Sequence, residues 1–143
     1  MLSLLALLLT GLSLDLPAAT QVGLEASFVP PARGASAGAV LVHFMPLGEG
    51  VKVNQEPAPR LRLETAGVLL DRQPPARHAS SVDPDFARYI EPREPVRFPV
   101  AIDPQARPGR YVVRATVSYS YCSKAQGWCR KGSQPVDIPV EIP

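Results

Sequence analysis

Proline is the feature that most limits the folds open to this chain. It occupies 17 of the 143 positions, more than twice its average frequency of roughly 5%. Because proline breaks the interior of an α-helix, this abundance favours short strands joined by stiffened turns. The length leaves room for one domain with a single core. We therefore expect one domain and one functional site.

Apolar and polar residues alternate in several segments, with the period of two that is typical of half-buried β-strands. The predicted strands are Val22–Phe28, Ala39–Phe44, Val51–Val53, Arg60–Glu64, Val96–Ile102, Tyr111–Tyr121 and Val136–Ile142. No segment shows a sustained helical period, and proline-rich turn signals separate the strands. This pattern predicts an all-β fold, an antiparallel β-sandwich.

The N-terminal run of leucine and alanine, Leu2–Leu14, is shorter than the roughly 18 apolar residues of a membrane-spanning helix. It is typical of a secretory signal. We expect a signal peptide at 1–19, a single domain at 20–143, and export to the periplasm or another extracytoplasmic compartment. The formal net charge of +2, without a basic cluster interleaved with aromatic residues, predicts no nucleic-acid partner.

The two cysteines, Cys122 and Cys129, flank a polar, glycine-containing stretch between two strand patterns. Such a stretch predicts a hairpin, whose ends lie opposite each other within the roughly 5.5 Å Cα separation that a disulfide needs. An oxidising compartment would allow the bond to form. Alternation places Cys122 opposite the face of Tyr121, so both sulfurs are expected to face solvent unless a bulge at Gly132 or Pro135 shifts the register.

Two functions are open for this disulfide on the residues alone. As a structural staple, closing an eight-residue loop would stabilise the fold by about 2.5 kcal/mol. As a redox site, an accessible disulfide could be attacked by the thiolate of a partner protein. The positive charges of Lys124, Arg130 and Lys131 would then favour the thiolate form of the reduced cysteines.

The cysteine hairpin resembles a known family. Its residues Tyr119-Ser120-Tyr121-Cys122, Trp128-Cys129-Arg130-Lys131 and Val136-Asp137-Ile138-Pro139-Val140 are similar to those of the N-terminal periplasmic domain of the thiol:disulfide interchange protein DsbD. Upstream, Gly50–Asn54 and Phe98-Pro99-Val100 before Gly109-Arg110-Tyr111 fall where such domains carry similar strands. The resemblance covers most of the chain after about Val22.

The resemblance implies an immunoglobulin-like fold and a thiol–disulfide oxidoreductase activity in which Cys122 and Cys129 are the redox pair. Electrons would come from a membrane-embedded thiol reductase and pass to thioredoxin-like periplasmic proteins, with Cys129 attacking the substrate. The chain carries neither the membrane domain nor the thioredoxin domain of that protein, so the donor is expected to be separate. No cofactor or metal is implied, and we expect a monomer.

The resemblance further implies a cap loop over the disulfide. The segment Asp83–Tyr89, whose Asp-Pro start favours a helical turn, lies in the comparable place, and Phe86 is the expected shielding residue. Tyr119, Tyr121 and Trp128 either pack in the core or line a docking surface. The alternative to the redox role is a non-catalytic immunoglobulin-like binding or scaffold domain with an inert disulfide.

Overall fold

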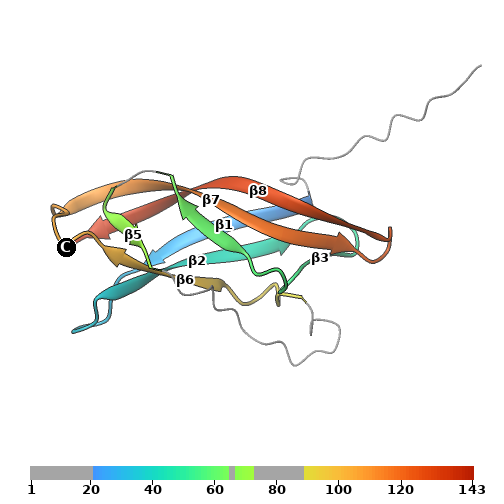
Figure 1. Ribbon diagram of the computed structural model, residues 1–143, viewed down its shortest axis with the longest axis horizontal. Helices are drawn as coiled ribbons and strands as arrows, with labels where there is room; N and C mark the ends of the chain where they lie inside the picture. Colours follow the sequence, from blue (N-terminus) through green and yellow to red (C-terminus); the bar gives the residue numbers. More distant parts are fainter. Residues whose placement is uncertain (1–20, 65–66, 73–88) are drawn as a thin grey trace, which may run out of the picture.

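The computed structural model describes residues 21–64, 67–72 and 89–143, and in this part of the chain it contains strands and no helix (Figure 1). The strands are β1 (Val22–Val29), β2 (Ala37–Pro46), β3 (Val51–Val53), β4 (Arg60–Leu63), β5 (Leu69–Asp71), β6 (Val96–Ile102), β7 (Gly109–Ser123) and β8 (Trp128–Ile142). The expected signal peptide and the segment 83–86, where a helical turn was expected, lie outside the described residues.

The strands form two antiparallel sheets. One has the order β1-β2-β6-β5. In the other, β7 pairs with β8 along one side and with β3 and β4 along the opposite side. Figure 1 shows β7 and β8 running side by side along the length of the molecule, with their hairpin at one end and the C terminus at the other. The predicted all-β antiparallel sandwich is therefore confirmed.

The core lies between the inner faces of the two sheets, as the alternation predicts. In β7 the buried inward residues recur at every second position and include Val113, Ala115 and Val117. β8 contributes Ile138 and Val140 from the same layer. The opposing sheet contributes residues of β2 and β6, namely Val40, Val42, Phe44, Val96, Phe98 and Val100. Burial of these aliphatic and aromatic side chains is the main force that holds the sheets together.

The pairing of β7 with β8 positions the functional site. It runs without interruption from Gly109↔Ile142 to Ser123↔Trp128, so neither Gly132 nor Pro135 introduces a bulge. Proline cannot donate a ladder hydrogen bond, so the pairs Val112↔Pro139 and Thr116↔Pro135 belong to the class without hydrogen bonds between the two residues. Because the two classes alternate along an antiparallel ladder, Cys122↔Cys129 belongs to the same, more closely spaced class.

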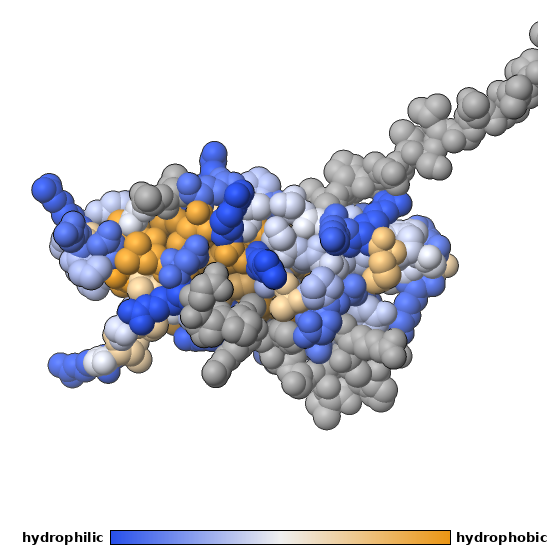
Figure 2. Space-filling model, in the orientation of Figure 1, coloured by the Kyte–Doolittle hydropathy of each residue, from blue (hydrophilic) through white to orange (hydrophobic). Residues whose placement is uncertain are grey.

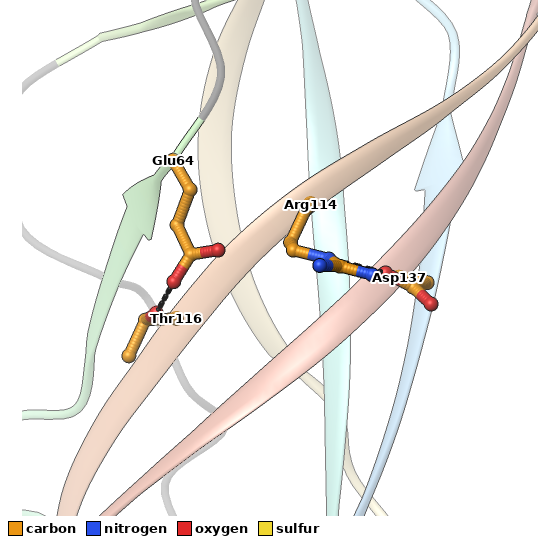
Figure 3. A network of polar contacts seen from close by, with 4 residues as sticks. All are labelled: Glu64, Arg114, Thr116 and Asp137. Carbon is orange, nitrogen blue, oxygen red and sulfur yellow. Dashed lines mark hydrogen bonds and ion pairs between the residues drawn. The ribbon is translucent and has the colours of Figure 1, made fainter.

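The outer face of this sheet is polar. Figure 3 shows two contacts there, an ion pair of Arg114 Nε with Asp137 Oδ1 at 3.3 Å and a hydrogen bond that the Thr116 hydroxyl donates to Glu64. Both partners of the ion pair are more than 60% exposed, so it adds little to stability. Figure 2 shows apolar residues gathered around β4 and β5 and mostly hydrophilic residues over the remaining described part of this face. No helix of the described residues is long and apolar enough to cross a membrane.

Candidate redox site at the hairpin end

A disulfide links β7 to β8 near the hairpin end of their ladder. Cys122 and Cys129 face each other directly in the register, with an S–S distance of 2.07 Å and a Cα–Cα distance of 4.0 Å. The Cα separation is shorter than the expected 5.5 Å because the pair belongs to the more closely spaced class, for which about 4.5 Å is usual. The two cysteines project from the face opposite Tyr121, as alternation predicts.

A tight four-residue turn, 124–127, closes the hairpin. Gly127 has φ of +70°, a conformation that favours glycine, and its N–H donates to the Ser123 carbonyl at 2.8 Å. The Ser123 hydroxyl accepts the N–H of Gln126 at 3.2 Å and donates to the Glu49 carbonyl at 3.2 Å. These bonds tie the turn to the loop before β3 and hold the disulfide at the end of the sheet.

The two cysteines differ in exposure. Cys129 is exposed, as expected, whereas Cys122 is only 8% exposed, so the expectation that both sulfurs face solvent is wrong for Cys122. The reason is that β3 pairs with the far side of β7 and places Lys52 directly beside Cys122. Asn54, two residues along on the same face, donates from Nδ2 to Cys122 Sγ at 3.4 Å.

A segment that is distant in sequence pairs with Asn54. Tyr89 forms an isolated bridge with Asn54, and its carbonyl accepts the Gln55 side-chain amide at 2.8 Å. The Tyr89 ring lies 5.4 Å from Lys52 Nζ and 5.3 Å from Lys124 Nζ, within cation–π range of both. Two lysines therefore meet at the Tyr89 ring, and one of them, Lys52, is the register partner of Cys122.

The aromatic residues of the hairpin lie on the other face. Tyr119 and Tyr121 are 4% and 2% exposed. Tyr119 packs edge-on with Phe44 and tilted with Tyr121, and Tyr121 packs edge-on with Trp128, at centroid distances of 5.3 to 5.6 Å. The possibility that the two tyrosines line a docking surface is therefore wrong, because both belong to the core. Trp128 is half-buried at the hairpin end, with the Arg130 guanidinium 4.3 Å from its ring.

Two residues of this site, Lys52 and Asn54, had no assigned role in the sequence analysis, and Tyr89 was the last residue of the expected cap segment Asp83–Tyr89. Val51 and Val53 are buried, so alternation along this short strand already implied that Lys52 and Asn54 share the opposite face. Their place beside Cys122 depends on a pairing between segments far apart in the chain. Phe86, the expected shielding residue, lies outside the described residues, and its role stays a prediction.

Comparisons of the chain with protein-family models, with curated proteins and with solved structures find no match.

Proposed function

We propose that the chain is an exported thiol–disulfide exchange module with an immunoglobulin-like fold, in which Cys122 and Cys129 are the redox pair. It relays electrons from a membrane-embedded thiol reductase to thioredoxin-like proteins of the periplasm. The observation that carries the proposal is the unequal exposure of the two cysteines, with Cys129 exposed and Cys122 8% exposed. One end of the bond is open to a partner protein while the other is held within the domain.

This asymmetry suits a sequence of two exchange steps. In the first, a thiolate of a dithiol partner attacks Cys129 Sγ, forms a new disulfide with it and releases Cys122 as a thiolate. The partner's second thiolate then attacks the sulfur of the partner's first cysteine in the mixed disulfide and releases Cys129 as a thiolate. The partner is oxidised by two electrons and the module is reduced. Delivery to an oxidised protein reverses these steps, with Cys129 attacking and Cys122 resolving the mixed disulfide.

The local charge supports this chemistry. Lys52 lies beside Cys122 in the register of β3 with β7, and Lys131 is two residues along β8 from Cys129, on the same face. Lys124 belongs to the turn that joins the two strands. Positive charge near a cysteine lowers the pKa of its thiol and increases the thiolate fraction.

The position of the disulfide also bears on the alternative, a binding or scaffold domain with an inert staple. β7 and β8 are paired over fifteen residues, and the bond closes only the short loop at the end of that ladder. Its contribution of about 2.5 kcal/mol is at the low end for disulfides. The burial of Cys122 protects that sulfur from attack, but it leaves the exposed Cys129 open to a partner.

The reduction potential separates the two functions. Equilibration with glutathione or dithiothreitol buffers is expected to give a potential above about −300 mV, whereas inert structural disulfides typically lie below that value. In a second assay, the free cysteine of the Cys122→Ala variant is first converted to a mixed disulfide with thionitrobenzoate. The thiolate of a thioredoxin-like protein that retains one active-site cysteine should then attack Cys129, form the protein–protein disulfide and release thionitrobenzoate. The Cys129→Ala variant is the matched control and should form much less. A potential far below −300 mV, or equal trapping by both variants, would contradict the proposal.

A further inference from the structure

We propose that Asn54 stabilises the thiolate of Cys122 and thereby directs attack to Cys129; this rests on the exchange function proposed above. The observation is the hydrogen bond from Asn54 Nδ2 to Cys122 Sγ, 3.4 Å long and joining residues 68 positions apart in the chain. Asn54 therefore touches a sulfur atom that gains charge when the disulfide opens.

The backbone around Asn54 fixes the direction of its side chain. Its N–H donates to the Ser120 carbonyl at 2.8 Å, and it forms the bridge with Tyr89 on its other side. At the preceding position, the Val53 carbonyl accepts the N–H of Ile90 at 2.8 Å. Asn54 is thus held between β7 and the isolated bridge at Tyr89, and alternation directs its side chain to the face that carries Cys122.

Asn54 also has an unusual feature that a purely structural role leaves unexplained. Its Oδ1 atom is buried and has no hydrogen-bond partner among the residues that the structure describes. A buried acceptor without a donor is destabilising. A site that binds a thiolate accounts for retaining this group, because the same amide supplies the N–H that a thiolate needs. When Cys122 is a neutral thiol, a rotated amide can accept its S–H through Oδ1.

The charge created during exchange falls on the sulfur that Asn54 contacts. When a partner thiolate attacks Cys129 Sγ, the new S–S bond forms as the Cys122–Cys129 bond breaks, and the electron pair leaves on Cys122 Sγ with no proton transferred. Burial alone would disfavour this charge, whereas a hydrogen bond to the charged form favours it. A leaving thiol of lower pKa also departs faster, which makes Cys122 the better leaving group.

Other charged and aromatic groups belong to the same region, and a test must distinguish their effects on Cys122 from that of Asn54. They are Lys52 on β3, Lys124 in the turn, Lys131 on β8 and the ring of Tyr89. All of them remain in a variant that changes Asn54 alone. Ser120 provides a matched control, because it is 9% exposed, pairs with Lys131 on β8, and contacts Asn54 through its backbone.

The experiment titrates Cys122 alone, in a Cys129→Ala background, by following the ultraviolet absorbance of the thiolate against pH. We expect Asn54→Ala to raise the pKa of Cys122 by about one unit, the size typical of a lost hydrogen bond to a charged group. Asn54→Asp should raise it further through repulsion between like charges. Ser120→Ala should leave it within a few tenths of a unit.

In the protein with both cysteines, Asn54→Ala should slow reduction by dithiothreitol about threefold to tenfold. An unchanged pKa of Cys122 in folded Asn54→Ala, or in folded Asn54→Asp where the alanine variant does not fold, would overturn the inference. This outcome is distinct from failure of the exchange function, which the reduction potential of the unmodified protein decides. A shifted pKa supports the role of Asn54 at either potential.

Discussion

Gly132 shows how a single missing side chain shapes the core next to the disulfide. It pairs with Tyr119 across the β7–β8 ladder, and a Cβ atom at this position would lie 2.6 Å from Tyr119 Cζ and 2.8 Å from its hydroxyl. The Tyr119 ring therefore lies directly over the glycine. This placement lets the hydroxyl accept a hydrogen bond from the Gln134 side chain, which also donates to the Val22 carbonyl at 2.8 Å.

Replacing Gly132 with alanine is expected to destabilise the domain by about 1–3 kcal/mol, the usual cost of overpacking a core. The added methyl group would displace the Tyr119 ring from its packing against Phe44. Urea denaturation gives the free energy of unfolding. Gly23→Ala is the control, because a Cβ atom there would meet its nearest neighbour at 3.4 Å. Equal stability of the two variants would show that the ring can move at no cost.

The hydroxyl of Tyr119 gives a pH dependence with a definite sign. Burial raises the pKa of Tyr119; the hydrogen bond from Gln134 lowers it in part, and Tyr121 nearby raises it. The fold therefore favours the neutral phenol. This contribution is intact below about pH 10, where tyrosine in an unfolded chain ionises, and is lost as the pH rises through the higher folded pKa.

We accordingly expect the free energy of unfolding to decline above about pH 10 and to decline less steeply in Tyr119→Phe. Urea titrations of both proteins over that pH range measure the difference in slope. The comparison isolates Tyr119, because lysine and other tyrosine residues titrate in both proteins. Parallel slopes would contradict the prediction.

At the scale of elements, alternation was enough to predict most strands. β3 occurs at its predicted bounds and β6 at Val96–Ile102, because buried and exposed residues alternate clearly there. β5 was not predicted, since its three residues carry no periodic signal. β7 and β8 extend beyond their predicted ends to the hairpin, where pairing across a tight turn continues the strands regardless of local pattern.

The site was less predictable than the strands. The disulfide and its face follow from alternation and hairpin geometry, and the closely spaced class of the cysteine pair could have been derived from Pro135 and Pro139, which exclude ladder hydrogen bonds. The burial of Cys122 could not be derived from the sequence, because it depends on the packing of β3 and Tyr89 beside β7. Contacts between segments far apart in a chain are set by the whole fold, and a local pattern does not encode them.

At the scale of the whole molecule, the second sheet is built on the pairing of β7 with β8. β7 pairs with β8 over fifteen residues and is also held by β3 and β4 on its other side. The inward residues of both strands belong to the single core that joins the two sheets. The disulfide cross-links one pair at the end of this ladder, so the arrangement of the sheets does not depend on it.

The fold is therefore expected to survive reduction. Loss of the bond removes about 2.5 kcal/mol, which leaves a positive remainder if the domain has the usual stability of about 5–15 kcal/mol. Near-ultraviolet circular dichroism should keep its tertiary signal in excess dithiothreitol, while the urea midpoint falls. A variant with both Cys122 and Cys129 replaced by alanine should match the reduced protein. Collapse of the tertiary signal on reduction would instead identify the bond as a structural staple, because a relay must remain folded in both redox states.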